Sequence, residues 1–275
     1  MKDNMRTQLL RLNDANKGYL EKVYKDVFSG HPWHEDLICA NAKRENGDRC
    51  MVQYTSQRCE RFDVHKRKAA VENDCRNNYK SRVDIEARKG VVLLPEDGNL
   101  ERCIGCGEEL RVVQFYPDFV DHSELIRESI EKGGFIGYLA RVGEEIAGFS
   151  WGYTLPMTST KSVKFEKITP VLKLKGINPD RTFYGSEVGV VNKFQGAGIG
   201  SAVSAIRIEE AEKAGFEFFV TRTVNPYVHS ILERLFSGKE GEILLDDPER
   251  SSRWFRWKFD DLDQGAVKNA IDKLK

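Results

Sequence analysis

Residues 190–214 combine the end of an apolar run, a glycine-rich turn and a segment with helical spacing, and this order constrains the fold most. Val190 and Val191 end the apolar run, Gln195-Gly196-Ala197-Gly198-Ile199-Gly200 forms the turn, and residues 201–214 continue as a predicted amphipathic helix. A turn of this kind exposes backbone N–H groups at the positive end of a helix dipole. Glycines leave no Cβ to hold a phosphate away from these amides. The sequence therefore predicts a pyrophosphate cradle.

Three known nucleotide-binding loops can be compared with this turn. A Walker loop requires Lys immediately before its Ser or Thr, and Gly200 precedes Ser201, so this loop is excluded. A Rossmann fingerprint is spaced Gly-x-Gly-x-x-Gly and opens a βαβ series, whereas these glycines are spaced Gly-x-Gly-x-Gly and lie late in the chain. The third loop is Gln-x-x-Gly-x-Gly, which Gln195, Gly198 and Gly200 match in full. A glycine turn without a ligand is the plain alternative.

Gln-x-x-Gly-x-Gly is the acetyl-CoA loop of the GNAT superfamily of N-acetyltransferases, which this chain resembles. Downstream, the β-rich run Phe216 to Val224 leads to Asn225-Pro226 and a helix-like segment through Phe236, similar to the second cofactor motif of the family. Upstream, Phe135 to Ala140 and Ile146 to Tyr153 have the alternation of a hairpin. The resemblance implies a mixed α/β (α+β) fold with a largely antiparallel sheet splayed around acetyl-CoA.

The resemblance also implies which residues bind acetyl-CoA. In the family, the strand before the loop offers free N–H groups to the pantetheine amides and the thioester carbonyl. The loop binds the diphosphate, and the Asn contacts the pantetheine arm. By position the cofactor-binding residues are Val188, Gly189, Val190, Gln195, Gly196, Ala197, Gly198, Ile199, Gly200, Ser201 and Asn225.

Acetyl transfer to an amine needs a group that removes the proton of the incoming ammonium. Glu187 is the candidate base, directly or through a water, and a solvent-facing carboxylate is the equal alternative. Tyr184 and Ser186 are placed to order such a water. Many family members use a Tyr as general acid where this chain has Leu232, and Tyr227 is the only Tyr on that segment. The implied reaction is direct transfer from acetyl-CoA to a primary amine, without the usual acid.

Composition and charge exclude several other classes. The chain has 275 residues and a formal net charge of zero, so no global field recruits nucleic acid or an anionic membrane. No run of eighteen apolar residues is present, and the first residues lack the apolar core of a signal peptide. We therefore expect a cytoplasmic protein, a monomer or homodimer, that acts on a small-molecule or peptide amine, without a membrane or nucleic-acid partner.

All six cysteines lie between residues 39 and 106. Clustered cysteines in a reducing compartment indicate metal before disulfide. Cys103-Ile104-Gly105-Cys106-Gly107 has zinc-knuckle spacing, because two thiolates on one tight turn can reach one tetrahedral ion. Cys75 lies in a charged segment with helical spacing and is expected to be an ordinary helix residue.

The remaining zinc ligands come from the resemblance. Some similar family members carry a zinc-ribbon insertion whose first Cys lies six residues past a Pro-Trp turn, and Trp33 and Cys39 keep that spacing. The partner expected at position 42 is Ala42. The predicted structural zinc site is therefore Cys39, Cys50, Cys103 and Cys106, with Cys59 as the alternative to Cys50.

Together these predictions divide the chain into three segments. Residues 1–36 supply the N-terminal strand and helix of the acetyltransferase domain, residues 37–115 form the zinc-ribbon-like insertion, and residues 116–275 form the acetyl-CoA-binding core. One alternative is a catalytically inactive, zinc-stabilised GNAT-like binding module that contacts nucleic acid through residues 64–88. Another is an NAD-type binder. The sequence does not select the acceptor amine.

Overall fold

The computed structural model describes residues 7–29, 37–39, 53–55, 91–93, 112–114, 122–156, 163–223, 225–247 and 252–274. The chain forms two compact units. One contains Met1–Val23 and Glu124–Lys275, and the other contains Tyr24–Ser123.

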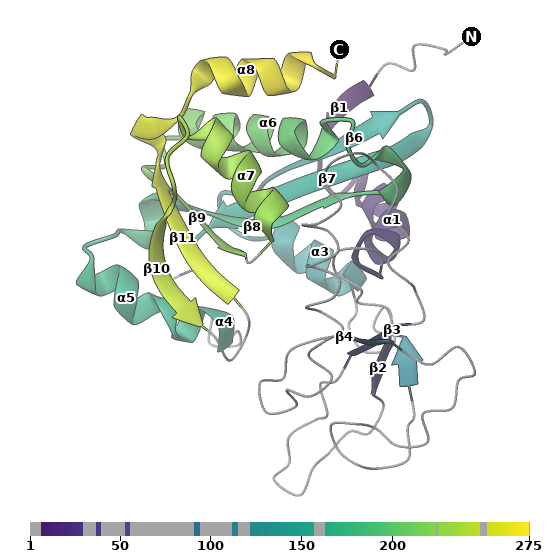
Figure 1. Ribbon diagram of the computed structural model, residues 1–275, viewed down its shortest axis with the longest axis horizontal. Helices are drawn as coiled ribbons and strands as arrows, with labels where there is room; N and C mark the ends of the chain where they lie inside the picture. The colour runs from purple at the N-terminus through teal and green to yellow at the C-terminus, as the bar shows by residue number, and fades with distance from the viewer. Residues whose placement is uncertain are drawn as a thin grey trace, which may run out of the picture. The chain divides into compact units, whose positions relative to one another are not determined.

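A seven-stranded sheet with the order β1-β6-β7-β8-β9-β11-β10 is the framework of the larger unit (Figure 1). Every neighbouring pair is antiparallel except β8 and β9, which run parallel. The predicted mixed α/β class with a mostly antiparallel sheet is therefore confirmed. The strands are β1 (Thr7–Arg11), β6 (Ile136–Val142), β7 (Glu145–Thr154), β8 (Thr182–Val190), β9 (Phe218–Thr223), β10 (Glu242–Asp247) and β11 (Ser252–Lys258).

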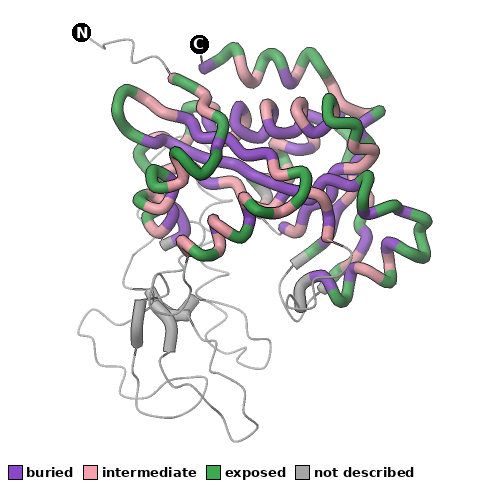
Figure 2. The backbone as a smooth tube through the Cα atoms, turned by 180° about the vertical axis from the view of Figure 1, so that it is seen from behind, coloured by how far each residue is buried: buried purple, intermediate pink, exposed green. Residues whose placement is uncertain are grey.

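The helix α6 (Ile199–Lys213) packs on one face of this sheet, against β6, β7 and β8 (Figure 1). The C-terminal helix α8 (Gln264–Asp272) packs on α6. Because α6 has protein on two sides, it is buried around most of its surface, and Figure 2 shows buried residues along α6 and the central strands. Its predicted polar face is therefore largely covered. The other helices are α1 (Lys17–Ser29), α3 (His122–Ile130), α4 (Val163–Glu166), α5 (Ile168–Leu174) and α7 (Pro226–Leu235).

The core of this unit is rich in aromatic rings. One cluster joins the α6 face of the sheet to α7 and includes Phe183, Phe219, Phe236 and Trp257. Stacked and tilted ring pairs at centroid distances of 5.8–6.2 Å link these side chains. Aromatic burial contributes a large part of the hydrophobic stabilisation of a domain this size.

Several elements agree with the sequence predictions. The hairpin pattern becomes β6 and β7, and Gly143 in the turn between them has φ +61°. The predicted helix after the glycine turn becomes α6, and the helix-like segment after Asn225 becomes α7. Helix α8 was not predicted.

The smaller unit contains a four-stranded sheet with the order β4-β3-β2-β5. β2 pairs antiparallel with β3 and β5, and β3 pairs parallel with β4. The bounds are β2 (Leu37–Cys39), β3 (Gln53–Thr55), β4 (Val91–Leu93) and β5 (Val112–Gln114).

Among the described helices, none has the length and apolar character needed to cross a membrane.

Candidate functional site

The parallel strands β8 and β9 pair over only part of their length. Their register runs from Thr182 opposite Phe218 to Gly185 opposite Thr221, and no later pair is present in the described sheet. On its other side, β8 stays paired with β7 as far as Val190 opposite Gly148. The edge of residues 186–190 that faces β9 therefore lies outside the sheet ladder. An open edge of this kind can pair with an extended, amide-bearing ligand.

A β-bulge lies where the two strands part. Gly185 pairs with Gly152 and Glu187 pairs with Trp151, so Ser186 is the extra residue on β8. The Thr221 hydroxyl donates to the Gly185 carbonyl at 2.8 Å. This bond fixes β8 and β9 at their last shared position.

Arg207 of α6 holds the other side of the bulge. Its Nη1 donates to the carbonyl oxygens of Trp151 at 2.8 Å and Glu187 at 3.0 Å. The side chain is only 3% exposed, and its guanidinium carbon lies 5.5 Å from the centroid of the Phe219 ring. Burial lowers the pKa of Arg207 to about 9, against the opposing effect of the Glu187 carboxylate. Sequence reasoning missed this residue, and its only signal was a single cation inside the apolar run Ala205-Ile206-Arg207-Ile208.

The residues on β8 divide between the two faces of the sheet. A Cβ at Gly148 would lie 2.8 Å from Ile199, so Gly148 faces α6. Gly148 lies on β7, and side chains alternate between faces along a strand. Trp151, three residues later on β7, therefore faces the opposite side, and its partner Glu187 on β8 shares that side. Tyr184 pairs with Tyr153 on the same side. Both candidate catalytic residues therefore lie on the face that α6 does not cover.

Tyr184 is enclosed by aromatic side chains. Its ring centroid lies 5.2 Å from that of Phe165 and 5.5 Å from that of Trp254. Burial raises the pKa of Tyr184 well above its ordinary value, the Arg222 charge opposes this rise, and the Glu187 charge adds to it. Tyr184 is therefore neutral at physiological pH, while Glu187 is partly accessible.

The glycine turn joins the end of β8 to α6 through the short helix η4 (Asn192–Phe194). The Gln195 side chain donates to the Val190 carbonyl at 3.2 Å and to Asn192 Oδ1 at 2.9 Å, so it closes this turn. Gly196 and Gly198 both have φ +83°, in the left-handed region that strongly favours glycine. The glycines therefore determine the turn itself.

Helix α6 begins without a side-chain cap. Its N-cap is Gly198, and among the described residues no side chain accepts a hydrogen bond as a cap there. Ile199, Gly200 and Ser201 form the first turn, where α-helical N–H groups have no partner within the helix. The predicted cradle residues thus come together at an uncapped helix start, which favours an anion.

A cation from a distant helix lies beside this helix start. Arg234 of α7 places Nη2 3.4 Å from the Ser201 hydroxyl, and its Nε donates to the Ser230 carbonyl at 3.1 Å. No ion pair of Arg234 is present among the described residues, so its charge is available to an anion at α6. Sequence reasoning did not find Arg234 because only the fold brings α7 to the start of α6.

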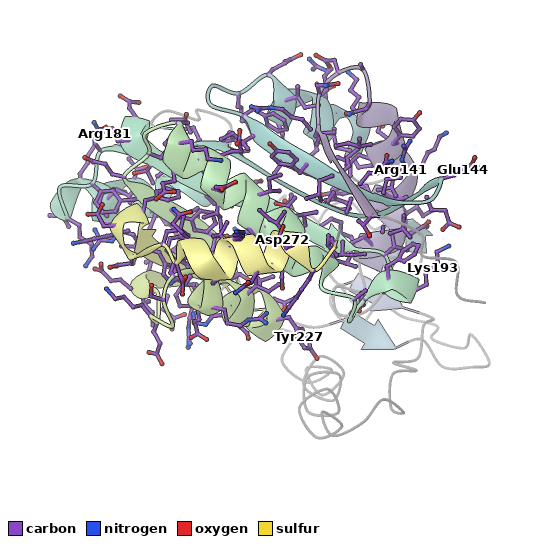
Figure 3. The ribbon with its side chains drawn as sticks, turned by 90° about the horizontal axis from the view of Figure 1, so that it is seen from above. Arg141, Glu144, Arg181, Lys193, Tyr227 and Asp272 are labelled. Carbon is purple, nitrogen blue, oxygen red and sulfur yellow. The ribbon has the colours of Figure 1, made fainter. Side chains whose placement is uncertain are left out.

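The second predicted cofactor motif is present at the start of α7. Asn225 is the N-cap, and its side-chain oxygen accepts from the Tyr227 N–H at 2.9 Å. Leu232 is 2% exposed and packs in the core, so this position faces away from solvent. Tyr227 is 37% exposed, and in Figure 3 it lies at the periphery of the body and points away from the sheet. Neither residue supplies an obvious acid at the open strand edge.

The predicted zinc site falls almost wholly outside the described residues. Of its candidates, only Cys39 lies in a described element, at the end of β2, while Cys50, Cys59, Cys103 and Cys106 lie outside. Within the described part of the chain, no group of three or more His, Cys, Asp or Glu residues is arranged to hold a metal ion. The zinc site stays a prediction.

Comparison with known proteins gives structural likeness but no sequence match. No protein-family model matches the sequence, and no curated protein matches it significantly. The PaiA N-acetyltransferase of Thermoplasma acidophilum, solved with coenzyme A, is 10% identical with a TM-score of 0.43, over 93% of this chain and 100% of that one. An acetyltransferase of Thermus thermophilus is 14% identical with a TM-score of 0.33, over 56% of this chain and 79% of that one.

A third solved structure differs in activity. A CoA-dependent acyl-homoserine lactone synthase is 15% identical with a TM-score of 0.37, over 51% of this chain and 64% of that one. These similar structures are acetyl- and acyltransferases. At this level of likeness, the function of the present chain has to be argued from its own residues.

Proposed function

We propose that this protein transfers an acetyl group from acetyl-CoA to a primary amine. The observation that carries the proposal is the joining of two features by one short turn. The open edge of β8, residues 186–190, is joined to the uncapped start of α6 at Gly198 by η4 and the glycine turn. Coenzyme A has a matching arrangement, because its amide-bearing pantetheine arm is joined to a diphosphate.

In this proposal each feature binds one part of the co-substrate. The N–H groups of Val188 and Val190, alternate residues that face away from β7, bind the pantetheine amides and the thioester carbonyl by extending the sheet, and Gly189 between them bonds to β7. The first turn of α6 and Arg234 bind the diphosphate, whose two negative charges suit a helix start and a guanidinium. Gln195 stabilises the turn through its two hydrogen bonds. Asn225 caps α7 with its side-chain oxygen, and its amide nitrogen donates to the pantetheine arm.

The chemistry then follows from placement. The amine approaches on the face that carries Glu187, while the thioester lies along the β8 edge. Glu187 takes the ammonium proton, directly or through a water, and the amine nitrogen attacks the carbonyl carbon. Backbone N–H groups stabilise the oxyanion. The C–S bond breaks as the tetrahedral intermediate collapses. The nitrogen gives its second proton to water, and water gives a proton to the thiolate, since Leu232 and Tyr227 are not placed to supply one. Holding both reactants provides a large part of the rate.

Thermal denaturation with acetyl-CoA tests the proposal. We expect acetyl-CoA to raise the melting temperature of the wild type, and Gly198→Glu to abolish the shift by placing a carboxylate at the helix start. Gly215→Glu is the matched control, because Gly215 has φ +85° at the other end of α6 and equally open surroundings. Gly215→Glu should keep the shift. A wild type that does not respond to acetyl-CoA would overturn the proposal.

A thiol-release assay over a panel of amines then identifies the acceptor. If acetyl-CoA binds and no amine in the panel releases thiol, the inactive binding module becomes the better hypothesis. A shift with NADH and none with acetyl-CoA would favour the NAD-type binder. The structural zinc site, Cys39, Cys50, Cys103 and Cys106, is a separate proposal, and unchanged zinc content in Cys103→Ser would refute it.

A further inference from the structure

Arg207 is a charged side chain in a place where burial of a charge is costly. It lies between α6 and the sheet, over the Phe219 ring, and is 3% exposed. An uncompensated buried cation destabilises a fold, because the charge loses its hydration. Its two described hydrogen bonds, to the carbonyls of Trp151 and Glu187, offset part of this cost. A methionine or leucine would fill such a site without any such cost, so the charge itself calls for an explanation.

The hydrogen bonds of Arg207 hold the bulge at the strand divergence. Trp151 and Glu187 pair directly across β7 and β8, beside the extra residue Ser186. A Cβ at Gly185 would lie 2.5 Å from the Phe219 ring, over which the guanidinium of Arg207 is placed, so Gly185 leaves the room that this ring needs. Thr221 holds Gly185 from the other side. The backbone of residues 185–187 is therefore fixed at both ends of the bulge.

Fixing the Glu187 carbonyl also fixes the next N–H group. The peptide unit between Glu187 and Val188 is planar and trans, so its N–H points opposite to its C=O. Because the carbonyl faces Arg207, the Val188 N–H faces away from Arg207. That N–H is the first one beyond the bulge on β8, where the ladder with β9 is already absent in the described sheet.

We propose that Arg207 is a positioning residue for acyl transfer, which orients the Glu187–Val188 peptide so that the Val188 N–H binds the thioester carbonyl. The inference rests on the proposed function. Arg207 then promotes the binding of the acyl-pantetheine half of acetyl-CoA and has no effect on the binding of the nucleotide half. The nucleotide half binds at the start of α6, beyond the glycine turn.

Two ligands separate these halves. The wild type, Arg207→Met and Arg207→Lys are titrated by calorimetry with acetyl-CoA and with adenosine 3′-phosphate 5′-diphosphate. We expect Arg207→Met to weaken acetyl-CoA binding by about tenfold and to leave nucleotide binding within about twofold. Arg207→Lys keeps a donor and a charge and should recover part of the loss. Arg234→Met is the matched control, since it should weaken both ligands by the same factor.

The outcomes are distinguishable. If the wild type binds neither ligand, the proposed function fails. If the wild type binds both ligands and Arg207→Met weakens both by the same factor, or weakens neither, the positioning role of Arg207 is refuted and the proposed function stands. If a variant does not fold, the inference can still be tested on the wild type by nuclear magnetic resonance. The amide resonance of Val188 should shift with acetyl-CoA and stay in place with the nucleotide alone, and an amide that ignores acetyl-CoA would overturn the inference.

Discussion

The Thr221 hydroxyl and the Gly185 carbonyl are joined by a buried hydrogen bond of 2.8 Å at the last position where β8 and β9 pair. One residue further along β8, the strand bulges and the ladder ends. This bond therefore marks the vertex of the divergence between the two strands, and its loss should be felt both in stability and in the geometry of the open edge.

Thr221→Val removes that hydroxyl with little change of shape. We expect the free energy of unfolding to fall by about 1–2 kcal/mol, because the Gly185 carbonyl loses a buried donor. Urea denaturation measures the change. Thr169→Val is the control, since the Thr169 hydroxyl donates only to Phe165, one helical turn earlier. Equal losses in both variants would contradict a special role for Thr221.

Gly148→Ala tests how closely α6 approaches the sheet. An added Cβ would lie 2.8 Å from Ile199 and 2.9 Å from the Gly189 carbonyl, and the latter is backbone that cannot move aside easily. We expect a loss of about 1–3 kcal/mol by chemical denaturation, together with weaker acetyl-CoA binding. Gly18→Ala in α1 meets no atom within 4 Å and should cause no loss. A fully stable Gly148→Ala would show that this contact relaxes freely.

Arg234→Ala tests the cation beside Ser201. The affinity for acetyl-CoA should fall by about fivefold at low ionic strength, and the difference from wild type should shrink as salt is added. Calorimetric titrations at low and high salt check this. Arg253→Ala provides the comparison, because Arg253 is paired with Asp246 on β10 and should leave binding unchanged. A loss that is independent of salt would point to packing as the cause.

Glu187→Gln tests the proposed base. Turnover should fall by about a hundredfold or more, while acetyl-CoA affinity changes little, because the amide keeps the shape of the side chain. The control is Glu217→Gln, which removes a surface ion pair with Arg181. Thiol release at saturating amine measures both. If Glu187→Gln keeps its turnover, Glu187 is not the base and is a solvent-facing carboxylate.

Tyr184→Phe tests the buried phenol through the pH dependence of stability. Burial raises the pKa of Tyr184 in the folded state above its unfolded value. The folded state then holds its proton more tightly, so this contribution is complete below about pH 10 and is lost as pH rises further. Stability at alkaline pH should decline less steeply in Tyr184→Phe than in wild type. Parallel curves for the two proteins would show that the phenol ionises normally.

Local signals in the sequence were sufficient for much of this site. The positive φ of Gly196 and Gly198, the turn at Gly143 and the cap at Asn225 each follow from one residue type in one local context. These signals act over a few residues, so a single sequence is enough to detect them. The mixed α/β class follows from the order of the same elements.

The site residues that the sequence did not reveal depend on contacts between distant segments of the chain. Arg207 and Arg234 look like surface cations until α6 packs on the sheet and α7 reaches Ser201. The aromatic enclosure of Tyr184 combines α4 with β11, which are far apart along the chain. Helical spacing and charge alone do not contain such information. The strand divergence also has no local mark, since Ser186 carries no signal of a bulge.

Helix α6 is held between the sheet and α8, and its first residue, Ile199, is 2% exposed. A ligand that binds at this end of the helix finds the N–H groups already oriented, so little conformational entropy is lost on association. The phosphate end of the co-substrate can therefore act as a rigid anchor. The acyl group at the other end is then the part whose position adjusts to the acceptor.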